Sequence, residues 1–181
     1  LKPRKNLFLL LDVWAAIAAC LPTPRLMIAG GGPLRASLER QTRRLGLDGR
    51  VVFTGYVPES EKAAYFNLAD VFLFPSAMEG VGFSVVEAMA SGVPVVASDR
   101  GSIPELVADG ESGFVCDPAV PARFVERLVR LLSDPGLRKT LASAGRERAS
   151  RLFQWDRCVT ATRHVYEHTI ETWRRRGGPP R

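Results

Sequence analysis

Cysteine and histidine are scarce in this 181-residue chain, which contains three cysteines and two histidines. Cys20, Cys116 and Cys158 are odd in number and far apart, so they do not form the framework of a disulfide-stapled domain, and no CxxC spacing indicates zinc. We therefore expect reduced thiols, as in a cytosolic protein. The two histidines follow an HxxEH order at residues 164–168, but no third ligand accompanies them, so we expect solvated side chains and no metal site.

The chain also lacks a hydrophobic run long enough to cross a membrane. Its longest apolar stretches, residues 7–11 and 13–21, are bounded by Asp12 and Pro22, and neither approaches the roughly 20 apolar residues of a membrane-spanning helix. The start LKPRKN has no initiator methionine and none of the features of a signal peptide. We interpret the sequence as a piece of a longer, cytoplasmic chain.

Negative charge is scarce in the C-terminal third. Residues 1–120 carry 11 basic and 13 acidic side chains, whereas residues 121–181 carry 14 basic and 6 acidic ones. Such a basic segment can contact anionic lipid, nucleic acid or an acidic partner, or can form a solvated helical surface. Because basic and aromatic residues do not interleave on short strands, we expect no nucleic acid. A peripheral contact with the anionic face of the cytoplasmic membrane stays open.

Short apolar runs alternate with helical patterns along residues 1–120. The apolar runs are rich in β-branched and aromatic residues and are bounded by Gly, Pro, Asp or Ser, as buried parallel strands are. They cover residues 25–30, 51–55, 70–76, 93–99 and 113–116. Helices are expected at residues 7–19, 33–45, 60–69, 84–90 and 103–107. This alternation predicts an α/β fold with a doubly wound, Rossmann-like parallel sheet.

The two ends of the chain depart from this alternation. Residues 121–176 have a helical apolar period and predict a helical C-terminal segment, followed by a disordered tail at 177–181. At the other end, the helix 7–19 has no strand before it, although the first strand of a doubly wound sheet is usually central. We therefore expect a single domain, residues 1–181, whose first strand lies upstream of residue 1.

A glycine-rich bend with a carboxylate at each end, EGVGFSVVE at residues 79–87, joins a strand to a helix. Gly80 and Gly82 allow the backbone to approach a ligand closely, and the free N–H groups at a helix start attract a phosphate or diphosphate. Glu87 could then accept hydrogen bonds from the vicinal hydroxyls of a ribose, and Glu79 from those of a sugar. An alternative stays open, because SVVE is also a capping box in which Glu87 returns to the helix start.

The segment around this bend resembles the donor-binding domain of retaining glycosyltransferases with two facing Rossmann domains, the GT-B type, and of glycosyltransferase family 4 in particular. The signature of that family places seven residues between two glutamates and continues into an AMAxGxPVVA run. Here it reads Glu79, Glu87 and AMASGVPVVA. The similarity extends to LMIAGGGPLR and VVFTGYVPE upstream and to RLFQW before the last predicted helix, so it covers nearly the whole chain.

The resemblance implies a role for each part of the bend. Glu87 would bind the ribose hydroxyls of a nucleoside diphosphate sugar. Glu79 would be a catalytic residue that binds hydroxyls of the transferred sugar close to the reacting carbon. The backbone of Gly82, Phe83 and Ser84 would hold the diphosphate and the sugar, with Gly80 in the same bend.

The resemblance also implies roles outside the bend. In LKPRKN, Lys5 matches the lysine that neutralises the leaving diphosphate, and it is the second catalytic candidate. The arginine that accompanies this lysine in the family would fall just before Leu1, and Arg4 is not its equivalent. The nucleotide base would lie against the loop after the strand at 51–55, through backbone contacts of Tyr56 and Val57.

A second glycine turn, AGGGPLR at residues 29–35, follows the first predicted strand. It is a partial match to the dinucleotide fingerprint, but Arg35 replaces the third glycine and the next strand ends without an acidic residue, so NAD or FAD is not expected. In the resembling family this turn lines the cleft near the donor. Gly31 and Gly32 are therefore further donor-binding candidates.

The residues and the resemblance together predict an enzyme of the hexosyltransferase type. With an N-terminal acceptor domain outside this chain, it would transfer a sugar from a nucleoside diphosphate to an acceptor hydroxyl with retention, without a metal or another cofactor. We expect this fragment alone to be inactive and the acceptor to belong to polysaccharide or glycolipid biosynthesis. Two alternatives stay open: a non-catalytic nucleotide-binding or scaffold module of the same fold, and a sugar-nucleotide epimerase.

Overall fold

Parallel strands form the centre of the computed structural model, which describes residues 1–21 and 23–176. The predicted tail at 177–181 lies outside the described residues. The strands are β1 (Leu26–Ala29), β2 (Val51–Gly55), β3 (Phe72–Phe74), β4 (Val95–Ser98) and β5 (Phe114–Cys116). Each lies within one of the five predicted runs and pairs in parallel with its neighbours, so the predicted α/β fold is confirmed.

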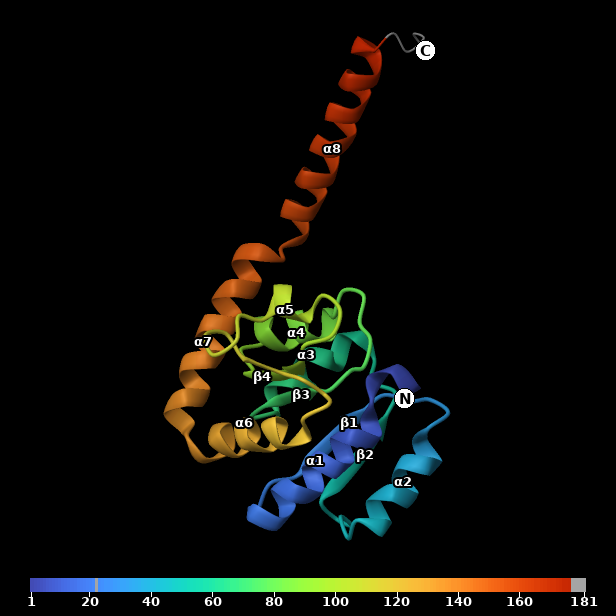
Figure 1. Cartoon of the computed structure of the whole chain (residues 1–181), viewed down its shortest axis with the longest axis vertical. Helices are drawn as coiled ribbons and strands as arrows, with labels where there is room; N and C mark the ends of the chain where they lie inside the picture. Colours follow the sequence, from blue (N-terminus) through green and yellow to red (C-terminus); the bar gives the residue numbers. More distant parts are fainter. Residues whose placement is uncertain (22, 177–181) are drawn as a thin grey trace.

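One helix precedes the first strand, and the others connect the strands or form the C-terminal segment (Figure 1). The helices are α1 (Leu7–Cys20), α2 (Arg35–Arg44), α3 (Lys62–Asn67), α4 (Phe83–Ala90), α5 (Ile103–Leu106), α6 (Pro121–Ser133), α7 (Pro135–Leu152) and α8 (Trp155–Arg175). Two short 3-10 turns, η1 (Pro3–Lys5) and η2 (Glu59–Glu61), precede α1 and α3. Gly46 and Gly92 follow α2 and α4 with positive φ angles of 66° and 74°, as glycines that end helices do.

The strands are divided between two sheets. β1 pairs with β2 in one sheet, and β4 lies between β3 and β5 in the other. In a doubly wound sheet the strands lie in the spatial order 3-2-1-4-5-6. Without its first strand, such a sheet divides into a pair, strands 3-2, and a triplet, strands 4-5-6, which is the arrangement seen here. Both sheets contribute to one hydrophobic core, with Leu26 and Ile28 from β1 and Val96 and Phe114 from the other sheet. An upstream first strand stays a prediction.

Burial differs between the two sheets, and the prediction of buried strands is wrong for parts of β1 and β2. Met27 of β1 and Val52 of β2 are 36% and 50% exposed. The core residues of α1 and α2 pack with one face of β1, so its burial alternates along the strand. β4 is buried at all four residues, because its two faces belong to two different hydrophobic clusters, which include residues of α6 and α4 respectively.

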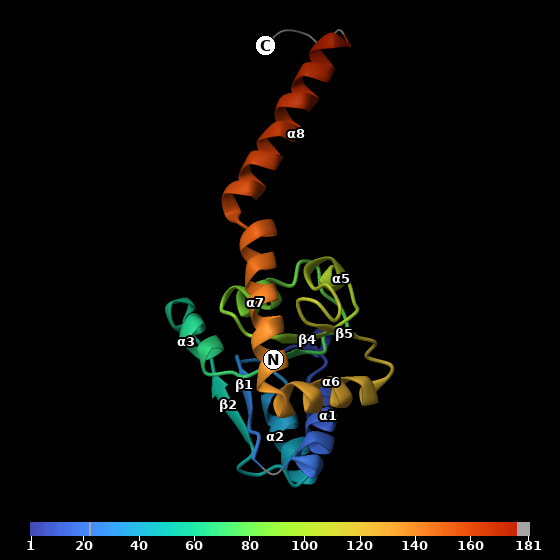
Figure 2. The same ribbon diagram turned by 90° about the vertical axis from the view of Figure 1, so that its left-hand side faces the viewer.

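The C-terminal segment first packs against the sheet domain and then leaves it. α7 lies against α4, where a Cβ on Gly145 would be 3.7 Å from Cγ of Met89. α8 extends away from the rest of the structure in both views (Figures 1 and 2), and it has no buried residue. Within residues 1–21 and 23–176, no helix is both long and apolar enough to cross a membrane.

Candidate functional site

The glycine bend turns the chain from the carboxyl end of β3 into α4. Gly82 is the N-cap of α4 with a φ of 74°, a left-handed conformation that favours glycine. A Cβ at this position would lie 2.7 Å from Cδ1 of Ile103 and 2.9 Å from Cδ1 of Leu106. The helix therefore begins at Phe83, one residue before the predicted start. The backbone N–H groups of Phe83 and Ser84 have no acceptor among the described residues.

Two predicted donor-binding residues of the bend are open to solvent. Gly80 has no positive φ, and no atom lies within 4 Å of the position that its Cβ would take. The side chain of Phe83 is 69% exposed. Of the atoms of Phe83, only the backbone N–H group is placed to receive an anion, because it lies in the first turn of α4.

Two cations and a carboxylate meet beside the bend. Nζ of Lys5 lies 2.5 Å from Oε2 of Glu79, and Nη1 of Arg4 lies 3.0 Å from Oε1. The Glu79 side chain is 9% exposed, and its Cγ would lie 3.6 Å from a Cβ on Gly82, the N-cap of α4. The cluster therefore borders a helix N-terminus, where negative charge is favoured. The structure brings together the two predicted catalytic residues, Glu79 and Lys5, which are 74 positions apart in the sequence.

The cations keep Glu79 ionised. Burial alone would raise the pKa of its carboxyl, but hydrogen bonds from Lys5 and Arg4, together with their charges, outweigh burial and hold the pKa below its ordinary value. Nζ of Lys5 also lies 4.5 Å from the ring centroid of Phe74, a cation–π contact that fixes the ammonium group. At neutral pH the Glu79 carboxylate can therefore only accept hydrogen bonds, which the hydroxyl groups of a sugar can donate.

Two buried serines that the sequence analysis missed hold the turn that carries the cations. The carbonyl oxygen of Arg4 accepts hydrogen bonds from the Ala77 N–H (2.8 Å) and the Ser76 hydroxyl (2.9 Å). The Ser98 hydroxyl donates in turn to the carbonyl oxygen of Ser76, at 2.6 Å. Both serines are fully buried. The available signal was a serine at the end of the predicted strand 70–76 and another next to the end of the predicted strand 93–99.

A third residue that the sequence analysis missed, Gly101, supports Glu79 through the backbone. Its φ is 62°, and a Cβ there would lie 2.9 Å from the carbonyl carbon of Glu79 and would overlap the carbonyl oxygen. The loop after β4 thus touches the main chain of Glu79 directly. No side chain larger than hydrogen fits between them.

Glu87 lies on α4 with a partly exposed carboxylate, and the capping box that was the alternative does not form. α4 has no side-chain cap. Oε1 of Glu87 lies instead 3.4 Å from Nζ of Lys62, which also lies 2.8 Å from Oε2 of Glu59. The Glu87 side chain is 36% exposed, so its carboxylate is accessible to a ligand.

The remaining candidates lie on two loops that follow β2 and β1. Tyr56 comes directly after β2 and is 81% exposed, and Val57 is partly buried. Gly31 and Gly32 follow β1, where the backbone nitrogen of Leu1 donates to the carbonyl oxygen of Gly31 and a Cβ on Gly32 would overlap the Leu1 backbone. Within the described residues, no hydrogen bond or ion pair joins either loop to the glycine bend.

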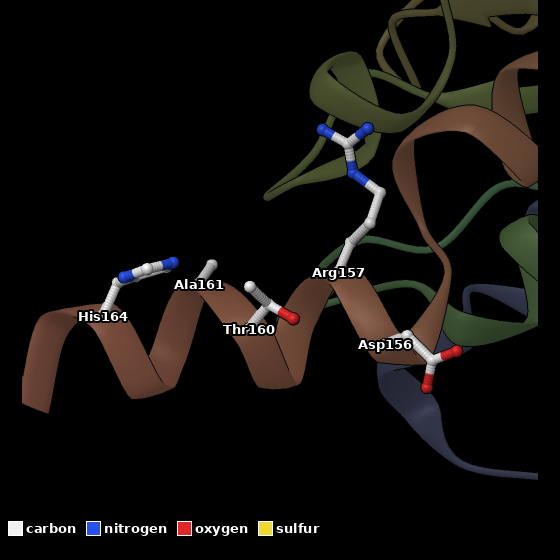
Figure 3. Close-up of a pocket in the computed structure, with 5 residues that line it drawn as sticks. All are labelled: Asp156, Arg157, Thr160, Ala161 and His164. Atoms are coloured by element: carbon white, nitrogen blue, oxygen red, sulfur yellow. The ribbon is translucent and has the colours of Figure 1, made fainter.

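A surface hollow of about 410 Å³ lies on α8, away from the cluster of Arg4, Lys5 and Glu79 (Figure 3). All of its lining residues come from that one helix: Asp156, Arg157, Thr160, Ala161 and His164. It contains neither of the predicted glutamates and no second element that would close it. We therefore do not interpret it as a donor pocket.

No metal centre or disulfide emerges from the described part of the chain. Its His, Cys, Asp and Glu residues form no group of three or more that could hold a metal ion. Nδ1 of His164 lies 3.6 Å from Oε2 of Glu167. The three cysteines, all within the described residues, are unpaired, and burial raises the pKa of the Cys116 thiol to about 11, so this thiol is protonated at neutral pH.

Residues 1–148 match the family described as Glycosyl transferases group 1. The chain belongs to this family. A relative in Mycolicibacterium smegmatis, a GDP-mannose-dependent alpha-(1-6)-phosphatidylinositol monomannoside mannosyltransferase, is 36% identical over 162 residues, which are 86% of this chain and 42% of that protein. The chain thus spans less than half the length of this glycosyltransferase relative.

Solved structures of glycosyltransferases share the fold. Anabaena HepE in complex with UDP superposes with a TM-score of 0.81 at 29% identity, over 94% of this chain and 46% of that one. Other structures of HepE contain UDP with glucose, or UDP-glucose. The C-terminal domain of a group 1 family protein from Francisella tularensis matches with a TM-score of 0.78 at 24% identity, over 86% of this chain and 83% of that one. The fold is therefore that of the C-terminal, Rossmann-like domain of GT-B glycosyltransferases.

Proposed function

We propose that residues 1–181 form the donor-binding domain of a retaining glycosyltransferase of family 4. In the whole protein, an N-terminal domain outside this chain would hold the acceptor, and the enzyme would transfer a hexose-type sugar to an acceptor hydroxyl. One observation carries the proposal: Glu79 and Lys5 meet beside the N-terminus of α4. Because the acceptor domain would be missing, we expect no transferase turnover from the 181-residue chain alone.

The bend offers a separate place for each part of the donor. The diphosphate would lie at the start of α4, where the N–H groups of Phe83 and Ser84 and the ammonium group of Lys5 favour negative charge. Glu87, about one turn further along α4, would accept hydrogen bonds from the ribose hydroxyls. Glu79 would accept them from the transferred sugar. The base would lie near Tyr56, on the side of α4 where Lys62 pairs with Glu87.

The chemistry requires stabilisation of the leaving group. When the bond between the anomeric carbon and the diphosphate oxygen breaks, the electron pair stays on the diphosphate. A fixed cation such as Lys5 stabilises this developing charge, and such contacts are worth roughly 3 to 4 kcal/mol each in transition states. We propose that protein cations perform this task without a metal ion. Retention of the anomeric configuration rests on the likeness to the family alone.

The rest of the protein would complete this domain in two places. A first strand between β1 and β3 would join the two sheets. α8 carries apolar side chains that are 47% to 77% exposed: Trp155, Val159, Val165, Tyr166, Ile170 and Trp173. Most of them recur at intervals of three, four or seven residues, as on one helix face, so we propose that this face packs against the upstream part of the same protein.

The names of the relatives suggest a class of donor and a class of acceptor. One is named for GDP-mannose and for a phosphatidylinositol mannoside, and HepE binds UDP and UDP-glucose. We propose a nucleoside diphosphate hexose as donor and an acceptor from glycolipid or polysaccharide biosynthesis. Such an acceptor would place the enzyme in the cytoplasm, at the membrane surface, where the basic residues of 121–176 could meet anionic lipid.

Calorimetric titration with UDP, GDP and ADP tests the proposal. We expect saturable binding of one nucleotide and at least tenfold weaker binding by Glu87→Ala, because a hydrogen bond to a charged group contributes about 1.5 to 3 kcal/mol. Glu126→Ala removes a carboxylate that is 66% exposed on α6 and should bind like the wild type. The 2′,3′-dideoxy form of the bound nucleotide lacks the ribose hydroxyls, so wild type and Glu87→Ala should bind it with similar affinity.

Three results would contradict the proposal. A folded wild-type protein that binds none of the three nucleotides would exclude a donor site in this chain. Unchanged binding by Glu87→Ala, or equal losses in Glu87→Ala and Glu126→Ala, would remove the assigned ribose contact.

A further inference from the structure

We infer that Arg4 is a second diphosphate-binding cation, which contacts the β-phosphate of the donor beside Lys5. The inference rests on the proposed function and deepens it. It also departs from the sequence prediction, in which Arg4 is not equivalent to the arginine that accompanies the lysine in the family. The contact between the Arg4 guanidinium group and the Glu79 carboxylate points to this role.

The ion cluster leaves the Arg4 guanidinium free to hold a second anion. Each oxygen of the Glu79 carboxylate meets one cation, Oε1 with Arg4 and Oε2 with Lys5, so the cluster carries one unbalanced positive charge. The Arg4 side chain is 45% exposed, whereas that of Glu79 is 9% exposed. A guanidinium group has five N–H donors. The Arg4 guanidinium donates through Nη1 to Glu79, and its other N–H groups have no acceptor among the described residues.

The backbone of Arg4 is fixed independently of its side chain. Its carbonyl oxygen accepts hydrogen bonds from the Ala77 N–H and the Ser76 hydroxyl, and the Ser76 carbonyl accepts one from the Ser98 hydroxyl. The turn η1 is therefore docked on the loop that leads into Glu79. Replacement of the Arg4 side chain leaves all three bonds in place, so we expect Arg4 variants to fold.

The position beside Glu79 identifies the phosphate. In the proposed arrangement Glu87 binds the ribose and Glu79 binds the transferred sugar, so a cation on Glu79 lies at the sugar end of the diphosphate. That end is the β-phosphate, whose oxygen keeps the electron pair when its bond to the anomeric carbon breaks. The acceptor oxygen forms the new bond to that carbon, and its proton is released to solvent. A guanidinium group suits this phosphate because it can donate two parallel hydrogen bonds.

The test compares diphosphates with monophosphates in calorimetric titrations of UDP, GDP, ADP, UMP, GMP and AMP. For the diphosphate that the wild type binds, Arg4→Gln should weaken binding about tenfold, the loss expected for a hydrogen bond to a charged group. Binding of the matching monophosphate should change less than twofold. Arg4→Lys should recover part of the loss. Lys2→Gln removes a charge from the residue before η1 that forms no ion pair within the described residues, and it should bind like the wild type.

The outcomes separate this inference from the proposed function. If the wild type binds a diphosphate and Arg4→Gln binds it equally well, the assignment of Arg4 is wrong and the donor site stands. Equal losses for diphosphate and monophosphate, or an equal loss in Lys2→Gln, would also overturn the assignment, since they would indicate a general effect of structure or charge. If the wild type binds no diphosphate, the proposed function fails and the assignment fails with it.

Discussion

Replacement of Gly82 by alanine should destabilise the domain strongly, for two reasons that the structure makes explicit. An L-residue in the left-handed conformation that Gly82 adopts, with φ of 74°, costs about 1 to 2 kcal/mol. The new Cβ would also lie 2.7 Å and 2.9 Å from the methyl groups of Ile103 and Leu106, which are buried. Such overpacking costs about 1 to 3 kcal/mol. We expect Gly82→Ala to lower the free energy of unfolding by about 2 to 5 kcal/mol.

Gly80, two residues earlier, offers a matched control. It has no positive φ and no atom within 4 Å of its potential Cβ, so Gly80→Ala should change the free energy of unfolding by about 0.5 kcal/mol or less. Equilibrium unfolding in urea, followed by circular dichroism, measures both variants. In thermal unfolding, the loss expected for Gly82→Ala corresponds to roughly 4 to 20 °C in Tm for a domain of this size.

The comparison would refute the reasoning in either of two ways. Equal effects of Gly82→Ala and Gly80→Ala would show that neither φ nor packing at the N-cap distinguishes the two glycines. A Gly82→Ala variant as stable as the wild type would mean that α4 does not begin at this N-cap.

Three further predictions concern charge, metal and membrane. Lys5 and Arg4 outweigh burial and lower the pKa of Glu79 from its ordinary value of 4.5. Its ionised carboxylate therefore contributes stability above that pH, and this contribution is lost as the pH falls through the lowered pKa. Glu79→Gln should flatten the stability profile below about pH 4.5, and an unchanged profile would contradict this. Nucleotide binding should be unaffected by EDTA, and a loss that Mg²⁺ restores would contradict the metal-free site. Co-sedimentation with liposomes should increase with the content of anionic lipid and decrease with the salt concentration. Binding that depends on neither would exclude a membrane contact through the basic residues of 121–176.

Local patterns were sufficient to predict most of the elements. Each strand is a short apolar run between turn residues, such as residues 93–99, which contain β4. Gly46 and Gly92 mark helix ends because the left-handed conformation after a helix favours one residue type. The resemblance implied separate catalytic roles for Glu79 and Lys5 but no contact between them, and the structure brings the two side chains into contact.

The rest of the site depends on contacts between distant segments, which no local pattern contains. The capping box was an open alternative because SVVE fits it, yet Gly82 becomes the N-cap when Ile103 and Leu106 pack against the bend. Arg4 reaches Glu79 because its carbonyl group is docked by hydrogen bonds from Ser76 and Ala77. In the sequence, these residues are more than 70 positions from Arg4, and nothing local marks them as partners.

Backbone amide NMR of the protein during titration with UDP, GDP and ADP tests the central claim most directly, because it locates the bound diphosphate. The account predicts that one nucleotide shifts the amide signals of Phe83 and Ser84 at the start of α4 most strongly, together with those of Lys5 and Glu87. Shifts confined to the glycine turn at residues 29–35 or to α8, or no shifts at saturating nucleotide, would contradict it.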